Sequence, residues 1–332
     1  MNVRFERQVP PGLAVRPPTL ADVQAVADLR NSVHRDEIGT DFTDPHEIRG
    51  YWTAPGVDLA RDELLVFNGT GTLVGQMSVY TREPFTRIEL DGFVRPDHVG
   101  GGVGTLLLAF AEGRGAEVAR RAPAEETIAL LVAAWKETGP AHDFFLARGY
   151  RPVRRFDDMK IVMDGPPPEP GWPDGITMRT FVSGVDDRAV FEGAEEAFQD
   201  HYGWTPASFD EWRHEEIDTD PHFDADLWFL AMDRDTIVGS CLCRTGRPED
   251  LTMGWVGDLS VRRPWRRRGI ALALLHHAFG EFHRRGVRRV GLGVDSESLT
   301  GANRLYERAG MQPYRSFLKY QKDLAPGGPG RA

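Results

Sequence analysis

The chain has 332 residues, of which 41% are hydrophobic and 27% charged, as is typical of a globular protein long enough for two domains. Its net charge of −10 disfavours proteins whose main partner is a nucleic acid or an anionic membrane, although a local basic patch is compatible with it. Residues 1–12 contain no apolar signal segment and no apolar run is long enough to span a membrane, so no membrane partner is expected. Two cysteines, Cys241 and Cys243, in so long a chain predict a reducing compartment and a cytoplasmic protein.

Prolines and glycines concentrate in residues 163–175, MDGPPPEPGWPDG, which divide the chain nearly in half. Proline this dense interrupts helices and sheets, so we predict a linker over residues 164–175. An N-terminal domain is expected over residues 1–163 and a C-terminal domain over residues 176–324, followed by a flexible tail over residues 325–332.

The two halves resemble each other in the order of their elements. Each begins with a short strand and a helix, and in the first half Thr19 and Asp22 are placed as a capping box. Each continues with a β-rich hairpin pattern that has Gly75 and Gly239 at matching places, and ends with a strand, a short helix and a last strand pair. A repeat this long indicates one αβ module used twice, as two domains.

Both halves also carry a strand, a turn with proline, a glycine loop and an apolar helix. The segments are IELDGFVRPDHVGGGVGTLLLAF and GWVGDLSVRRPWRRRGIALALLHHAF, in which Asp91 matches Asp258 and Gly102 matches Gly269. Such a loop leaves backbone N–H groups free at the helix start, where the helix dipole is positive. In the second half three arginines, residues 266–268, add charge, so we predict a phosphate- or pyrophosphate-binding loop. The lysine of a Walker loop and the glycine triplet of a dinucleotide fold are missing from it.

With these motifs the sequence resembles the GCN5-related N-acetyltransferases. Their phosphate loop, Gln/Arg-x-x-Gly-x-Gly/Ala, is matched by Arg266, Gly269 and Ala271, and their later helix, AxxLYExxGF, is matched by ANRLYERAGM. The first module departs from the family where Val99 replaces Arg/Gln and Phe145 replaces the tyrosine. The resemblance implies an α/β fold of two tandem domains, each a mostly antiparallel twisted sheet flanked by helices. This layout is similar to that of mycothiol synthases and of some acetyltransferases that modify antibiotics.

The resemblance also implies acetyl-CoA as the acetyl donor. The loop amides of the second module would hold its pyrophosphate, and the strand before the loop would pair with the pantetheine arm. The alternative is that the arginines form a solvated, basic start of a helix. The implied cofactor-binding residues are Leu259, Ser260, Val261, Arg266, Arg267, Arg268, Gly269, Ile270, Ala271, Leu272, Asn303 and Tyr306.

Two residues are candidates for proton transfer. By resemblance, Tyr306 is the general acid that reprotonates the departing CoA thiolate; the alternative is a core tyrosine on an amphipathic helix. The acceptor amine must lose a proton, and Asp258, on the strand leading into the loop, is our candidate general base. Because Asp91 matches it in the first half, a structural role for both aspartates is the alternative.

The segment FQDHYGWTPASFDEW occupies the place of the family's acceptor-site helices and loop. Its mixture of polar and aromatic side chains suits an acceptor pocket; the alternative is that the aromatic residues cover the core. The candidate acceptor-pocket residues are Asp200, His201, Tyr202 and Trp204.

The first module offers a second candidate cofactor site through the backbone of VGGGVG. Since Phe145 leaves it without the proposed acid, we expect this domain to be degenerate and catalytically silent. The residues of this second candidate site are Phe93, Val94, Gly100, Gly101, Gly102 and Gly104.

Together these features favour an N-acetyltransferase that moves an acetyl group from acetyl-CoA to a primary amine of a small molecule or peptide by direct attack. No metal is expected, since the CxC pair has no cluster of further ligands near it. The alternatives are a protein that binds or senses acyl-CoA without turnover and, disfavoured by the net charge, a nucleic-acid-binding protein. No nucleic-acid partner is therefore expected, and the protein would be a monomer or a homodimer.

Overall fold

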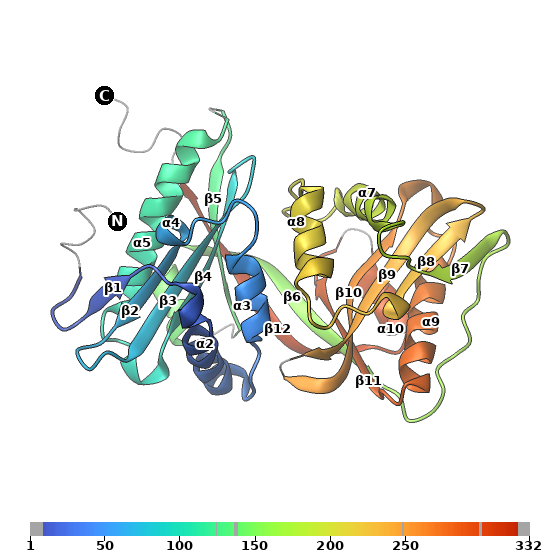
Figure 1. Cartoon of the computed structure of the whole chain (residues 1–332), viewed down its shortest axis with the longest axis horizontal. Helices are drawn as coiled ribbons and strands as arrows, with labels where there is room; N and C mark the ends of the chain where they lie inside the picture. Colours follow the sequence, from blue (N-terminus) through green and yellow to red (C-terminus); the bar gives the residue numbers. More distant parts are fainter. Residues whose placement is uncertain (1–8, 124, 136–138, 248, 299–300, 325–332) are drawn as a thin grey trace. The chain divides into compact units, whose positions relative to one another are not determined.

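A computed structural model of the chain describes residues 9–123, 125–135, 139–247, 249–298 and 301–324 (Figure 1). These residues form two compact units. Unit 1 comprises Met1–Arg154 and Phe317–Ala332, and unit 2 comprises Arg155–Ser316. The tail predicted over residues 325–332 lies outside the described residues.

Unit 1 contains a sheet in the order β1-β2-β3-β4-β5-β12, whose neighbours are antiparallel except for the parallel pair β4 and β5. The capping box predicted at Thr19 and Asp22 is confirmed, with the Thr19 N–H donating to Asp22 Oδ2 at 2.8 Å. The strands are β1 (Ala14–Arg16), β2 (Glu63–Phe67), β3 (Leu73–Thr81), β4 (Arg87–Val94), β5 (Ile128–Ala134) and β12 (Gln312–Leu324). The helices are η1 (Leu20–Asp22), α2 (Val23–Ile38), α3 (Pro45–Trp52), α4 (Leu59–Asp62), η2 (Pro96–His98), α5 (Val103–Val118), η3 (Ala119–Arg121) and α6 (Pro140–Leu146).

Unit 2 repeats this plan in the order β6-β11-β10-β9-β8-β7, again with one parallel pair, β10 and β11, which confirms the predicted fold class. The strands are β6 (Arg151–Val162), β7 (Ile176–Thr180), β8 (Trp228–Asp233), β9 (Thr236–Arg247), β10 (Asp250–Val261) and β11 (Arg289–Asp295). The helices are α7 (Asp187–Phe198), α8 (Phe209–Arg213), the π-helical turn η4 (His214–Asp218), η5 (Ala225–Leu227), η6 (Arg263–Trp265), α9 (Ile270–Arg284) and α10 (Ala302–Arg308).

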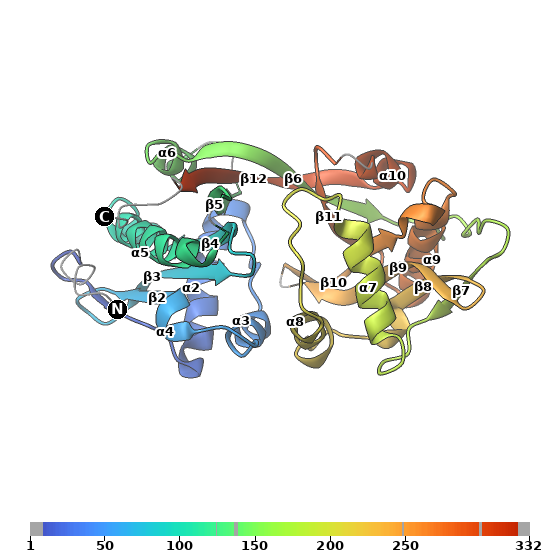
Figure 2. The ribbon, with the colours of Figure 1, turned by 90° about the horizontal axis from the view of Figure 1, so that it is seen from above.

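Helices flank the sheet of unit 2 (Figure 2), and side chains of its strands alternate between two cores on the faces of that sheet. On β9, Cys241 and Cys243 pack with Phe279 of α9 in the larger core. Leu242, between them, packs instead with Val190 of α7 and with Trp228. The face covered by α7 and α8 is therefore distinct from the face covered by α9 and α10.

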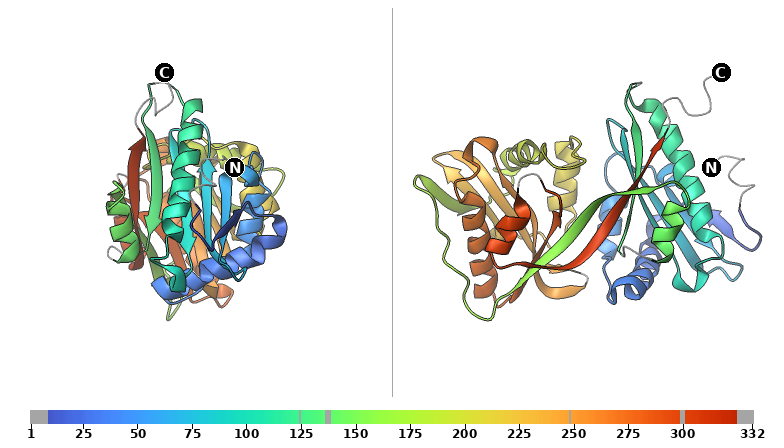
Figure 3. Two further views of the ribbon diagram at one scale, coloured as in Figure 1. Left: turned by 90° about the vertical axis from the view of Figure 1, so that its left-hand side faces the viewer. Right: turned by 180° about the vertical axis from the view of Figure 1, so that it is seen from behind.

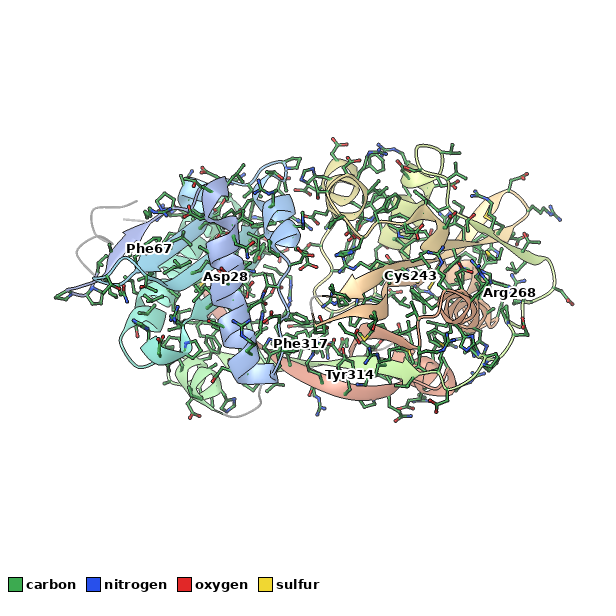
Figure 4. The ribbon with its side chains drawn as sticks, turned by 60° about the horizontal axis from the view of Figure 1, so that its bottom comes forward. Asp28, Phe67, Cys243, Arg268, Tyr314 and Phe317 are labelled. Atoms are coloured by element: carbon green, nitrogen blue, oxygen red, sulfur yellow. The ribbon has the colours of Figure 1, made fainter. Side chains whose placement is uncertain are left out.

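One strand of each unit comes from the other half of the chain (Figure 3). β6 enters unit 2 and pairs antiparallel with β11, from Phe156 opposite Asp295 to Val162 opposite Arg289. β12 returns to unit 1 and pairs with β5, and the boundary of the units falls between Tyr314 and Phe317 (Figure 4). The predicted ranges follow chain order and contain neither exchange, because periodicity shows that a segment is a strand but not which strand it pairs with.

Candidate active site

The central strands of unit 2 separate part-way along their length. β10 and β11 pair only at Gly254 opposite Val290 and at Trp255 opposite Gly291. Beyond this point β11 continues to pair with β6, while the facing edge of β10 makes no ladder with it. Gly257 is the extra residue of a β-bulge, which bends a strand and interrupts its pairing. The result is an open backbone edge on β10, directly before the glycine loop.

Asp258 follows this bulge and lies opposite Leu242 of β9. Its Oδ1 atom is buried, and in the described part of the chain it has no hydrogen-bond partner. Burial raises the pKa of the Asp258 carboxyl to about 8, and the nearby Glu216 carboxylate on η4 adds to that rise. A carboxyl in such a setting changes charge in the pH range in which a general base works.

Tyr306 lies on α10 and is 9% exposed. Burial raises the pKa of its phenol, and the proximity of Cys241 and Asp258 raises it further. The hydroxyl therefore stays protonated, which is the form a general acid requires. The structure thus brings together Asp258 and Tyr306, although one belongs to the strand before the loop and the other to a helix 48 residues later.

The two cysteines lie next to this pair, on β9. Their Sγ atoms are 3.5 Å apart and both are free thiols (Cys243 is labelled in Figure 4). Burial raises the pKa of Cys243, so its thiol is the neutral form at physiological pH and is a poor nucleophile.

The glycine loop presents free backbone donors at the start of α9. Gly269 caps the helix with a φ of 92° and Arg267 also has a positive φ of 63°, so successive N–H groups turn toward one side. Across the described residues, the N–H groups of residues 267–272 have no acceptor. Arg267 and Arg268 are exposed beside them (Arg268 is labelled in Figure 4). This arrangement fits a pyrophosphate.

Unlike the exposed Arg267 and Arg268, Arg266 forms hydrogen bonds within the protein. Its guanidinium binds the Val261 carbonyl at 3.0 Å, the Ala197 carbonyl at 2.8 Å and Asp200 Oδ2 at 2.7 Å. Arg263 binds the other oxygen of Asp200 at 2.8 Å, and the two arginines lower the pKa of Asp200 to about 2. The structure therefore uses Asp200, which we expected in the acceptor pocket, to tie the loop to the end of α7. No sequence pattern indicated this pairing, since Asp200 lies 63 residues from Arg263 without any periodic relation.

The other expected acceptor residues, His201, Tyr202 and Trp204, follow Asp200 in the chain. His201 packs edge-on against Phe198, and burial together with the Arg266 charge lowers its pKa, while Asp295 at the end of β11 acts in the opposite sense. Trp204 has a buried indole Nε1 without a partner in the described residues, and the Tyr202 hydroxyl is also buried. Of these three residues, His201 is placed near the loop by the effect of Arg266 on its pKa.

The side chains of the other expected cofactor residues on β10 and α10 make contacts within the protein. Leu259 and Val261 pack into the core beneath α9, and the Ser260 hydroxyl is 2.8 Å from that of Ser240. Only their backbone is then available to a pantetheine arm. Asn303 donates from Nδ2 to the carbonyls of Asp295 and Ser296, and so holds the turn that precedes α10.

In unit 1, β4 also pairs with its parallel neighbour β5 only as far as Leu90, but the aspartate and the tyrosine position differ from those of unit 2. Asp91 lies opposite Ser78 in an uninterrupted ladder and forms an ion pair with Arg30 at 3.1 Å. Phe145 packs on Tyr150 and Tyr320.

The second candidate cofactor site in unit 1 keeps the glycine backbone. Gly100 and Gly102 have φ values of 84° and 85°, and Gly102 caps α5. Val99 is 56% exposed, so no arginine ties this loop down. Phe93 lies under the Arg30 guanidinium, which is 4.7 Å from its ring centroid.

Known proteins match this chain along most of its length. Residues 189–311 match the acetyltransferase (GNAT) family. A mycothiol acetyltransferase of Salinispora tropica is 29% identical over 310 residues, which cover 92% of this chain and 93% of that protein. The crystal structure of a GCN5-related N-acetyltransferase from Sphaerobacter thermophilus is 38% identical, with a TM-score of 0.76, and covers 95% of this chain and 96% of that one. The chain belongs to the GCN5-related N-acetyltransferase family.

As a member of this family the protein is an acetyl-CoA-dependent N-acetyltransferase, which confirms the predicted enzyme class. A tandem GNAT protein from the clavulanic acid biosynthesis pathway, 17% identical with a TM-score of 0.68, shares the fold over 96% of this chain and 100% of that chain. Among the described residues, no helix is long and apolar enough to cross a membrane, and no group of three or more His, Cys, Asp or Glu side chains is placed to hold a metal ion.

Proposed function

We propose that unit 2 transfers the acetyl group of acetyl-CoA to a primary amine of a small molecule or peptide. The observation that supports this proposal is that Asp258 follows the point where β10 separates from β11 and is near enough to Tyr306 to raise the pKa of its phenol. The loop with free N–H groups lies at the end of the same strand, so a donor held there would lie along β10.

The backbone of unit 2 would hold acetyl-CoA at two places. The N–H groups of residues 267–272 would bind the pyrophosphate, and the open edge of β10 at residues 259–261 would pair with the amides of the pantetheine arm. Bound in this way, acetyl-CoA supplies a thioester carbonyl to an amine. Backbone N–H groups at the bulge around Gly257 would stabilise negative charge on its oxygen.

Asp258 would accept the proton that the amine loses. A pKa of about 8 lies much closer to that of an alkylammonium, about 10.4, than an ordinary carboxyl does, so the transfer is less unfavourable. As the new C–N bond forms and the C–S bond breaks, Tyr306 would donate its proton to the departing sulfur. As the amide forms, nitrogen loses its second proton, which restores the Tyr306 phenolate to the phenol, the phenolate being a stronger base than the Asp258 carboxylate. Asp258 would then release its proton to solvent.

Unit 1 would take no part in the chemistry. Arg30 neutralises Asp91, and Phe145 has no proton to donate, so neither proposed role can be filled there. Its glycine backbone could still hold an acyl-CoA, which would make unit 1 a supporting or binding unit.

The named relatives favour a small-molecule acceptor, since they are mycothiol acetyltransferases. A cytoplasmic location is part of the same proposal, because both cysteines are buried free thiols.

The proposal is tested by release of free thiol from acetyl-CoA in the presence of primary amines, with wild type and Tyr306→Phe compared. The expected result is amine-dependent release by wild type and a loss of about 10²-fold in kcat for the variant, with the Kd for acetyl-CoA unchanged. A protein that senses acyl-CoA without turnover would bind acetyl-CoA equally well in both forms and release no thiol in either, which would overturn the proposal.

A further inference from the structure

The matched aspartates of the two units differ in their counter-charge. In unit 1, Asp91 has the Arg30 guanidinium at 3.1 Å, and this arginine also binds Gln76 and Ser78 on β3. In unit 2, Asp258 makes no ion pair with any described residue, and its Oδ1 atom has no hydrogen-bond partner. A buried carboxyl oxygen without a partner costs free energy. This cost is present at Asp258 of unit 2, whereas at Asp91 of unit 1 the Arg30 guanidinium offsets it.

Sequence position shows which residue of unit 2 stands in place of Arg30. Both units carry an ion pair at the start of the first long helix, Arg16 with Asp22 before α2 and Arg179 with Asp186 before α7. Counted from these aspartates, Arg30 comes eight residues later in α2, and the residue eight positions later in α7 is Ala194. Ala194 is 6% exposed, as expected for the inward face of the helix. Unit 2 therefore has a methyl group where unit 1 has a guanidinium.

The charged and titratable groups that face Asp258 supply no replacement cation. Glu216 on η4 adds a negative charge, while Tyr306 on α10 and Cys243 on β9 are neutral in their ordinary forms. The segment that carries Glu216 is also acidic: residues 209–226, FDEWRHEEIDTDPHFDAD, contain eight Asp or Glu side chains and one Arg. Arginines pair with Asp218, Asp220 and Asp224, and the acids exceed these arginines, so the segment keeps a negative charge that favours cations over anions.

We propose that the acceptor enters unit 2 as a cationic primary amine whose ammonium group takes, beside Asp258, the place that the Arg30 guanidinium takes beside Asp91. This inference rests on the proposed function and specifies its substrate class. The ammonium then gives one proton to Asp258 and attacks as the neutral amine. Nitrogen loses its second proton to the Tyr306 phenolate as the amide forms, and Asp258 releases its proton to solvent. Amines that carry a carboxylate on the same carbon, such as α-amino acids, are disfavoured because their negative charge would be brought toward Asp258 and Glu216.

Matched acceptors test this on the wild-type protein. Tyramine is compared with tyrosine, and cadaverine with lysine, by kcat/KM for thiol release from acetyl-CoA. We expect each amine to exceed its amino acid by at least about 10-fold, since a like charge at this site costs upwards of about 1.4 kcal/mol. Equal use of the amino acids would overturn the inference while leaving the proposed acetyl transfer intact. Failure of every amine would overturn both.

Restoring the cation in unit 2 is the second test. Ala194→Arg should reduce kcat/KM for tyramine at least about 100-fold while the Kd for acetyl-CoA is unchanged, because its guanidinium would occupy the acceptor's place. Glu192→Arg, which adds the same side chain on the exposed face of α7, should keep wild-type activity and is the matched control. Full activity in Ala194→Arg would contradict the inference.

A stability measurement separates this charge effect from simple crowding. The change in Tm caused by Asp258→Asn should be more negative in Ala194→Arg than in wild type, since only in the arginine variant does it leave a new cation without a partner. An equal change of Tm in both backgrounds would show that the arginine does not reach the carboxyl, and would count against the inference.

Discussion

The two units follow the same plan, and in both the parallel central strands separate part-way, but only unit 2 has a bulge directly before its aspartate and leaves that aspartate without a counter-charge among the described residues. In unit 1, Leu90 and Asp91 lie opposite Val79 and Ser78 without interruption, and Arg30 neutralises the aspartate. In unit 2 the bulge at Gly257 interrupts the ladder just before Asp258. The comparison teaches that unit 1 supplies the counter-charge of its aspartate from its own chain, whereas unit 2 leaves this requirement for a ligand to meet.

The largest effect is expected when the unpaired carboxyl itself is removed. Asp258→Asn should lower kcat/KM for the amine by about 10²- to 10⁴-fold, the usual contribution of a positioned general base. The measurement is thiol release at saturating acetyl-CoA. Asp91→Asn is the matched change in unit 1, and it should lower the Tm by removing the partner of Arg30 while leaving kcat/KM at the wild-type value. A comparable loss of activity in Asp91→Asn would remove the distinction between the units.

The pH dependence of kcat/KM should reflect the ionisation of the Asp258 carboxyl. Because burial raises the pKa of Asp258 to about 8, the group is protonated below that pH and cannot accept a proton, so kcat/KM rises as the pH increases toward 8. Two pH units below this value the expected loss is about 100-fold. If the amine enters as a cation, kcat/KM falls again near the acceptor's own pKa, whereas entry as a neutral amine gives a plateau. Absence of the rising limb in wild type would argue against Asp258 as the base.

A smaller effect is expected when Arg266, whose side chain holds the phosphate loop in place, is replaced. Arg266→Ala removes hydrogen bonds to the carbonyls of Val261 and Ala197 and the ion pair with Asp200. We expect the KM for acetyl-CoA to rise about 10-fold, with kcat changed by less than about 3-fold, because the loop would lose its anchor but not its backbone donors. Val99→Ala, at the matching place in unit 1, should leave both constants unchanged, and a larger effect there than at Arg266 would contradict this assignment.

The smallest effect is expected at Asp200. Its carboxylate is exposed and contributes through ion pairs with Arg263 and Arg266, which salt screens. Asp200→Asn should raise the KM for acetyl-CoA by about 2- to 3-fold at low ionic strength, and the difference should shrink at 0.5 M salt. A change in the KM for the amine instead would return Asp200 to the acceptor pocket in which the sequence placed it.

The sequence predicted the features that recur in both halves. The two modules, the glycine loops before α5 and α9, and the positions of Asp258 and Tyr306 all follow from local patterns that survive without the fold. The exchange of β6 and β12 could not be predicted in this way, since strand partners are set by tertiary packing. The bulge could not be predicted from the sequence either. The number of residues from the aspartate to the following glycine loop is the same in both halves, and the extra residue, Gly257, comes before Asp258.

The interactions of individual charged residues could not be predicted from the sequence either. Asp200 and Arg266 are joined only because the end of α7 meets the phosphate loop. Glu216 belongs to a run of acidic residues, in which nothing but the position of η4 singles it out. Long-range pairs of this kind depend on the packing of elements that are distant in the chain.

Paired removal of the matched residues tests most directly whether the chemistry is confined to unit 2. One variant combines Asp258→Asn with Tyr306→Phe, and the other combines Asp91→Asn with Phe145→Leu, and the rate of acetyl transfer to tyramine is measured for both in the full chain. The account predicts a loss of at least about 10³-fold in the unit 2 variant and a rate within about 3-fold of wild type in the unit 1 variant, provided that both remain folded by circular dichroism. A unit 2 variant that keeps its rate, or a unit 1 variant that loses it, would contradict the account.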